Sequence, residues 1–211
     1  MSTIVPDRPL RADAARNRGL VIDAARQLFA ERGLEVTLHD VAEAAGVGVG
    51  TVYRRFPDKE ALLGALVEAK YVGLIELAQR CAQLVDSREA LRTYLLGALE
   101  LRAGDKALSD VVMRAAPATA GVLLQRADLG AAVDSLIERA RTDGVVREGF
   151  GTADVPVFST MLGAVADRVR GGDPSAWRRY AVLLVDAVCP PEDDEGAALL
   201  GSPARLPLPG R

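Results

Sequence analysis

The stretch over residues 37–56 constrains the fold more strongly than any other part of this sequence. Thr37 followed three residues later by Asp40 is a variant of the capping box, and it predicts a helix that begins at Leu38. Gly46 suits the left-handed backbone that ends such a helix and turns the chain sharply. A second short helix fits the residues that follow. Two short helices around a glycine corner are typical of a helix-turn-helix, which places its second helix in the DNA major groove.

Helical periodicity continues through the rest of the chain, and no alternating strand pattern competes with it. Ala and Leu recur throughout, while aromatic residues make up only 4% of the sequence, a composition that favours an all-α fold. Capping residues, Gly and Pro mark the expected ends of the helices. We expect about nine helices, at 14–32, 38–45, 49–56, from 58 past 77, 87–103, 106–115, 129–142, 154–170 and 174–188, with a further short helical piece over 119–127.

Composition also predicts how the chain is organised. We expect a disordered arm over 1–13 and an N-terminal three-helix helix-turn-helix domain over 14–57. A C-terminal helical bundle for ligand binding and dimerisation is expected over 58–189. The tail over 190–211 is rich in proline, which opposes regular structure, so we expect it to be disordered.

Several classes of protein are disfavoured by what the sequence lacks. No apolar run approaches the roughly 18 residues of a membrane-spanning helix, and the first residues lack the apolar region of a secretory signal, so we expect a cytoplasmic protein. His39 is the only histidine, and Cys81 and Cys189 are the only cysteines. We therefore expect no metal site, no cofactor and no catalytic group of residues. Buried free thiols are the expected state of the cysteines, with a redox switch as the alternative.

The net charge of −3 does not by itself indicate a nucleic-acid-binding protein, but the distribution of charge is more informative. Basic residues gather near the N-terminus and again around the end of the second short helix, whereas 192–195 is an acidic run. Any contact with DNA should therefore use the N-terminal third of the chain. The basic clusters comprise Arg11, Arg16 and Arg18, and then Arg54, Arg55 and Lys59.

The segment from Thr37 to Leu62, TLHDVAEAAGVGVGTVYRRFPDKEAL, strongly resembles the DNA-binding domain of the tetracycline-repressor (TetR) family. The preceding AARQLFAERG, residues 24–33, is similar to the first helix of that family. The resemblance rests on motifs over residues 14–70, and over 71–190 it extends only to the number and length of the helices. It implies a homodimer that binds double-stranded operator DNA, has a C-terminal ligand-binding domain and usually represses transcription.

The resemblance also implies roles for individual residues. Hydroxyl and ammonium groups at family positions would contact phosphates, which fix the register on DNA without reading its sequence. Arg54 would contact guanine or a phosphate, from the face that approaches the base edges. The implied DNA-binding residues are Arg16, Arg18, Thr37, Gly48, Val49, Gly50, Thr51, Tyr53, Arg54 and Lys59.

Two positions depart from the family pattern. Gly48 stands where the family often has Ser as the N-cap of the second helix, and Gly is a weaker cap. Val49 stands where a polar residue is common, and its side chain suits contact with a thymine methyl group. Structural alternatives remain open for other residues: a helix cap alone for Thr37, the domain core for Tyr53 and Phe56, and plain surface charge for Arg54, Arg55 and Lys59.

By resemblance, the last two helices form the dimer interface, and the alternative is that their apolar side chains pack only within their own chain. The interface residues implied are Val157, Phe158, Met161, Leu162, Val165, Tyr180, Leu183, Leu184 and Val188.

The middle helices would enclose a cavity for a small effector, with an apolar or amphipathic ligand favoured. Ordinary core packing is the alternative for the apolar wall residues, and solvent exposure for the arginine. The candidate pocket residues are Leu74, Tyr94, Leu95, Leu99, Arg102, Met113, Leu123 and Ile137.

Other functions compete with a ligand-released repressor. An enzyme would need a nucleophile, a base and an orienting group, or a metal, and no such set stands out. A helical interaction protein that has lost DNA binding is a second alternative, and a transcriptional activator of the same fold is a third.

Overall fold

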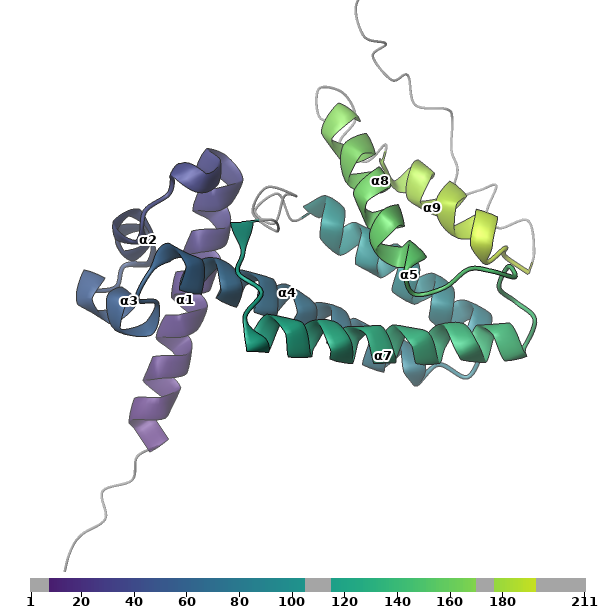
Figure 1. Cartoon of the computed structure of the whole chain (residues 1–211), viewed down its shortest axis with the longest axis horizontal. Helices are drawn as coiled ribbons and strands as arrows, with labels where there is room; N and C mark the ends of the chain where they lie inside the picture. Colours follow the sequence, from purple (N-terminus) through teal and green to yellow (C-terminus); the bar gives the residue numbers. More distant parts are fainter. Residues whose placement is uncertain (1–7, 105–114, 170–176, 193–211) are drawn as a thin grey trace, which may run out of the picture. The chain divides into compact units, whose positions relative to one another are not determined.

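The computed structural model describes residues 8–104, 115–169 and 177–192 (Figure 1). These residues form α-helices and one short 3-10 helix without any strand, which confirms the predicted all-α class. The elements are α1 (Arg8–Arg32), η1 (Gly33–Glu35), α2 (Leu38–Ala45), α3 (Val49–Arg55), α4 (Lys59–Ala82), α5 (Ser87–Gly104), α7 (Ala120–Thr142), α8 (Asp154–Val169) and α9 (Trp177–Val188).

The described residues divide into two compact units. The first unit contains residues 8–69 and 115–122, and the second contains residues 70–104, 123–169 and 177–192. The division falls inside α4, whereas we predicted a domain boundary between residues 57 and 58. That boundary stays a prediction about where the helix-turn-helix domain ends.

The first unit is held together by the inner faces of its short helices. α1 packs against α2, and α2 packs against α3. Val41, Ala42 and Val52 are completely buried, and Phe56 is buried at the end of α3. With 8 and 7 residues, α2 and α3 are shorter than the ~12–15 residues that an isolated helix needs for marginal stability. Their burial in the unit therefore decides whether they form.

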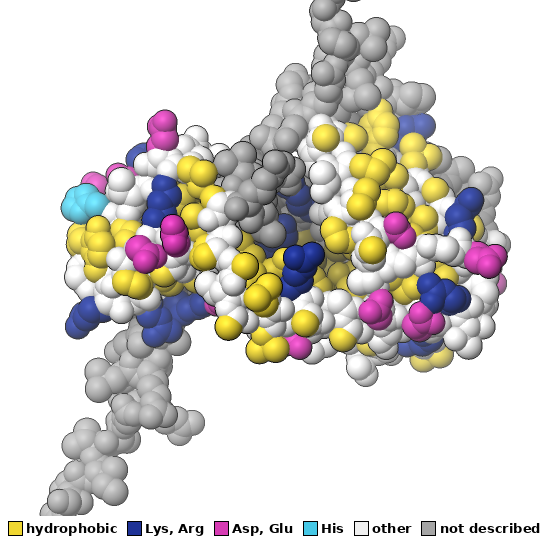
Figure 2. Space-filling model, viewed as in Figure 1, with side chains coloured by type: hydrophobic (Ala, Val, Ile, Leu, Met, Phe, Trp, Pro, Cys, Tyr) yellow, Lys and Arg dark blue, Asp and Glu magenta, His cyan; other side chains and the backbone are white. Residues whose placement is uncertain are grey.

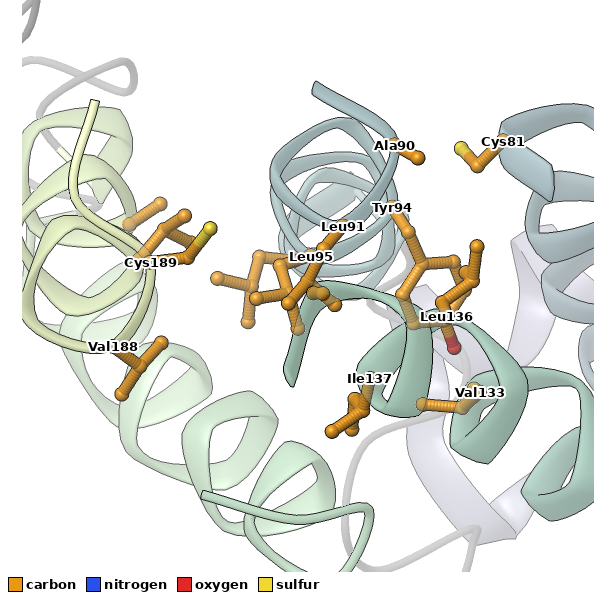
Figure 3. Close-up of a cluster of buried hydrophobic side chains, with 14 of the residues drawn as sticks. Cys81, Ala90, Leu91, Tyr94, Leu95, Val133, Leu136, Ile137, Val188 and Cys189 are labelled. Atoms are coloured by element: carbon orange, nitrogen blue, oxygen red, sulfur yellow. The ribbon is translucent and has the colours of Figure 1, made fainter. Parts of the chain in front are cut away.

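The second unit has a core centred on α5, which contacts both α8 and α9, while α8 contacts α9. Figure 3 shows Leu91, Tyr94 and Leu95 of α5 beside Val133 and Ile137 of α7. Burying a Leu or Ile side chain of this size contributes about 1.5–3 kcal/mol. The core also contains Ala78, Leu99, Leu136, Leu162, Ala181, Val185 and Val188.

Both cysteines lie in this second core as free thiols, as predicted. Burial raises the pKa of the Cys81 thiol and also that of the Cys189 thiol. A raised pKa keeps a thiol protonated and unreactive, since the thiolate is the nucleophile. Burial likewise raises the pKa of the Tyr94 phenol, so this side chain stays neutral in the core.

The structure corrects two of the predicted boundaries. α1 begins at Arg8, so residues 8–13 belong to a helix and not to the disordered arm that we predicted over 1–13. The two helices predicted over 119–127 and 129–142 are one continuous helix, α7. Gly130 and Asp128 do not interrupt it, because Val133 and its neighbours are fixed in the core. Most of the helix predicted over 106–115 and the start of the one predicted at 174 lie outside the described residues.

Three arginine side chains donate hydrogen bonds to carbonyl groups at the C-terminal end of α9. One of them, Arg92, forms an ion pair with Asp186 as well. Arg92 Nη2 lies 2.7 Å from Asp186 Oδ1, but the two groups are not aligned as a hydrogen bond. Positive charge is favourable there because helix carbonyls give the C-terminus a partial negative charge. The donor–acceptor pairs are Arg88 to the Pro190 carbonyl, Arg92 to the Cys189 carbonyl and Arg147 Nε to the Ala187 carbonyl.

We expect Arg92→Met to lower the free energy of unfolding by about 2–3 kcal/mol, because it leaves Asp186 half-buried without its cation and removes a charged hydrogen bond. Only 13% of the Arg92 side chain is exposed. The matched control is Arg178→Met, which breaks an exposed ion pair with Glu100 and should cost less than about 1 kcal/mol. Urea unfolding measures both values, and equal losses would contradict the role assigned to Arg92.

Candidate nucleic-acid interface

The N-terminus of α2 is fixed by a complete capping box. The Thr37 hydroxyl accepts a hydrogen bond from the Asp40 backbone N–H at 3.2 Å and donates one to the Asp40 carboxylate at 2.6 Å. The Thr37 backbone N–H donates to the same carboxylate at 2.8 Å. These hydrogen bonds, together with Arg32 at 3.7 Å, lower the pKa of Asp40. Thr37 is thus a helix cap, as predicted, and it is also exposed.

The corner between the two short helices is built on Gly46. Its backbone is left-handed, with φ 65° and ψ 29°, a conformation that a side chain would strain. The Gly46 N–H donates to the Glu43 carbonyl at 3.1 Å, and the Val47 N–H donates to the Ala42 carbonyl at 3.1 Å. The carbonyl groups at the end of α2 are therefore satisfied within the turn, and α3 can begin at Val49, only a few residues later.

α3 presents one buried side and one exposed side. Val52 is buried, whereas Tyr53 is 49% exposed and Gly50 is also exposed. The structure thus decides against the core alternative for Tyr53. Val49 and Thr51 are half-buried, which places the predicted α3 residues at or near the surface of one short helix. Gly48 caps α3 with extended backbone and no side-chain hydrogen bond, as expected for the weaker cap.

Arg54 lies back along α3 in this structure. Its Nε donates to the Gly50 carbonyl at 3.2 Å, and its Nη2 donates to the Thr51 hydroxyl at 3.3 Å. Three N–H donors of the planar guanidinium group are left for a partner. Arg55 is exposed on the same helix, although the resemblance assigned it no contact.

Lys59 has a partner that the sequence did not reveal. Its ammonium group donates to the Leu34 carbonyl and lies 5.8 Å from the centroid of the Phe29 ring. These contacts tie the start of α4 to η1 and α1. A phosphate contact by Lys59 would require the ammonium group to leave this position. Nothing in the local sequence signals a hydrogen bond to a backbone group 25 residues away.

Basic side chains gather on one edge of the lobe that carries α1–α3. Figure 2 shows Lys and Arg along the lower edge of this lobe. Arg16 is exposed and Arg18 is partly exposed on α1. Positive charge concentrated in this way is what an electrostatic contact with phosphates needs, even when the whole chain is acidic.

The predicted interface residues of α8 and α9 separate into two groups. Val157, Met161 and Leu183 are 54%, 49% and 41% exposed, a large apolar exposure for side chains of this type. Leu162 and Val188 are buried within their own chain and offer no surface to a partner, which corrects the prediction for these two. Phe158, Val165, Tyr180 and Leu184 are half-buried and pack against the core of the second unit.

The predicted pocket residues also differ in their surroundings. Tyr94, Leu95, Leu99 and Ile137 are buried in the second core, while Leu123 is 52% exposed. Leu74 and Arg102 are half-buried, and Met113 lies outside the described residues.

Among the described residues, no helix is both long and apolar enough to cross a membrane. In the same part of the chain, no group of three or more His, Cys, Asp or Glu side chains is placed to hold a metal ion.

Comparison with protein families matches residues 21–66 to the model described as bacterial regulatory proteins, tetR family. The chain is also similar to HTH-type transcriptional regulators of Staphylococcus aureus, for example those of strains USA300 and NCTC 8325, each 41% identical over 54 residues. That match covers 25% of this chain and only 29% of each relative.

Solved structures are similar over nearly the whole fold. A TetR transcription regulatory protein from Mycobacterium vanbaalenii is 28% identical with a TM-score of 0.61, covering 86% of this chain and 99% of that one. A TetR transcriptional regulator from Streptomyces coelicolor is 25% identical with a TM-score of 0.60, covering 82% and 98%. FadR from Bacillus subtilis, solved in complex with stearoyl-CoA, shares the fold at 20% identity with a TM-score of 0.62, covering 80% and 97%.

We expect Asp40→Asn to lower the melting temperature at neutral pH, because it weakens the hydrogen bonds that fix the start of α2. The folded-state pKa of Asp40 lies below its ordinary value of 3.8, so its contribution is present above that value and is lost as pH falls through the folded pKa. The difference between the variant and the wild type should therefore vanish in strong acid. Thermal unfolding followed by circular dichroism over this range measures it.

Glu43→Gln is the control for this experiment, since it removes an exposed carboxylate from the same helix. We expect it to leave the melting temperature unchanged. A constant difference between Asp40→Asn and the wild type at every pH would argue against the capping carboxylate.

Proposed function

The chain belongs to the TetR family of transcriptional regulators, and from this premise we propose that it binds a palindromic operator as a homodimer, represses transcription there and is released by a small molecule. The observation that supports DNA binding most strongly is the exposed side of α3, held at the Gly46 corner with Tyr53 and Arg54 outward. This is the position that a recognition helix needs in order to enter a major groove.

The proposed contacts are of two kinds: contacts to phosphates, which position the protein on DNA, and contacts to base edges, which read the DNA sequence. Thr37, Thr51 and Tyr53 contribute hydroxyl groups to phosphates, and Arg16 and Arg18 contribute positive charge from α1. Lys59 joins them only if its ammonium group exchanges the Leu34 carbonyl for a phosphate. Gly48, Val49, Gly50 and Arg54 form the part of α3 that approaches the bases, where Val49 can contact a thymine methyl group and Arg54 a guanine.

Dimerisation is supported by the exposed apolar side chains of α8 and α9. A single helix-turn-helix reads few bases, whereas a two-fold dimer reaches half-sites about 34–36 Å apart. Figure 2 shows hydrophobic side chains gathered over α8. Val157, Met161 and Leu183 would lose this exposure at a self-complementary interface.

Release by a ligand is supported by the fold, which in FadR accommodates stearoyl-CoA. We propose a small, apolar or amphipathic effector that acts on the protein in the cytoplasm. Its proposed contacts are Leu74, Tyr94, Leu95, Leu99, Arg102, Met113, Leu123 and Ile137. The coupling would run through α4, which begins in the first compact unit and ends in the second.

A binding assay with the intergenic DNA beside its gene tests the operator. We expect wild-type affinity to fall steeply with salt and Arg54→Ala to weaken binding by roughly tenfold to a hundredfold. Arg126→Ala, which removes the same charge from an exposed site on α7, should change little. Binding of the wild type that does not respond to salt, or equal affinities for all three proteins, would contradict the proposed DNA contact.

Sedimentation of charged variants tests the dimer. We expect Met161→Glu and Leu183→Glu to convert a dimer into a monomer, because each would bury a carboxylate in an apolar interface. Leu124→Glu changes an apolar residue on α7 that is even more exposed, and it should leave the dimer intact. A wild-type monomer, or dimers that survive both α8 and α9 substitutions, would rule out this interface.

A further inference from the structure

Two of the described helices, α4 and α7, each run from one compact unit into the other. α4 begins in the first unit and ends in the second. α7 begins at Ala120 in the first unit, which also contains residues 115–119, and it continues into the second unit from Leu123. Any contact that fixes the start of α7 to α4 therefore limits how α4 can move within the first unit.

The backbone of α4 comes close to the residues that precede α7. A Cβ atom built on Gly64 of α4 would lie 3.7 Å from Thr119 Cγ2 and 3.8 Å from Pro117 Cγ. Thr119 also caps α7, because its hydroxyl accepts a hydrogen bond from the Val122 backbone N–H at 3.2 Å. Val122 itself is buried. The capped start of α7 is therefore packed against the first half of α4.

One turn further along α4, the half-buried Glu68 carboxylate lies over the first turn of α7. A Cβ atom built on Gly121 would collide with Glu68 Oε1 and would lie 3.2 Å from Glu68 Cδ. The carboxylate thus occupies the space that a side chain at position 121 would need. Backbone N–H groups give the first turn of a helix a partial positive charge, which favours a carboxylate there. Gly121 therefore admits a negative group of α4 to the positive end of α7.

We propose that the contact between Glu68 and Gly121 fixes α4 to α7 and thereby sets which separation of operator half-sites the dimer prefers. Only residues 56–58 separate α3 from α4, and Lys59 at the start of α4 donates to the Leu34 carbonyl of η1. The helix-turn-helix must therefore follow a rotation of α4. This inference rests on the proposed operator binding as a homodimer. It makes Glu68 and Gly121 positioning residues, which act on DNA through α4.

Discrimination between half-site spacings tests the inference. The reference is a duplex that the wild-type protein selects from a random-sequence library, and two altered duplexes carry one base pair more or fewer between the half-sites, a change of about 3.4 Å. We expect the wild type to bind the altered duplexes roughly thirtyfold more weakly than the reference. Gly121→Ala, which displaces the carboxylate, should reduce this ratio to about fivefold or less. Glu68→Ala should reduce it equally, and the double variant should go no further, because both changes remove one contact.

Gly73→Ala is the matched control, since Gly73 is also helical, in α4, with no atom within 4 Å of an added Cβ. It should keep the wild-type ratio. A contact that only stabilises the fold would weaken binding to all three duplexes by the same factor, and an unchanged ratio in Gly121→Ala and Glu68→Ala would overturn the inference. A wild type that binds all spacings equally would also overturn it, while the proposed operator binding would stand. A wild type that selects no duplex would overturn both.

Discussion

Burial of the inner faces of α2 and α3 is the interaction on which the proposed DNA-reading surface depends. Neither helix is long enough to be stable in isolation. Val41, Ala42 and Val52 are removed from water completely, and this burial offsets the cost of ordering the two helices and their corner. The outward side of α3, where Gly50 and Tyr53 are exposed, is then accessible to a partner.

The features that short-range chemistry determines were predicted from the sequence. The Thr37–Asp40 capping box and the Gly46 corner each depend on residues within a few positions, and the structure shows both. Features decided by packing were missed or misplaced. α7 continues through Gly130 because the side chains beyond it are fixed in the core, and Lys59 bonds to a carbonyl 25 residues away. Leu162 and Val188 fit an apolar interface pattern, but helical periodicity cannot distinguish the core of one chain from the contact between two.

Arginine serves two physical purposes in this chain, and the hydrogen-bond partners of its side chains separate them. In the second unit, Arg88, Arg92 and Arg147 donate to carbonyl groups at the end of α9, where their charge complements the helix terminus. In the first unit, Arg16, Arg54 and Arg55 are exposed, and Arg54 bonds only to its own helix. This separation explains why the net charge of −3 is a poor guide to the partner. Under the proposed function, the local excess of positive charge on the first unit, and not the net charge, would determine the attraction to phosphates.

Under the proposed mechanism, the effector can weaken operator binding only by as much as it prefers one conformation of the protein over another. Typical couplings of about 1–3 kcal/mol correspond to a change in affinity of roughly 5- to 150-fold. The proposed operator contacts of α3 come from side chains on one helix of 7 residues, so a displacement of that helix would weaken them together. A modest coupling would then be enough to change operator binding, provided that the effector prefers a conformation in which α3 is displaced.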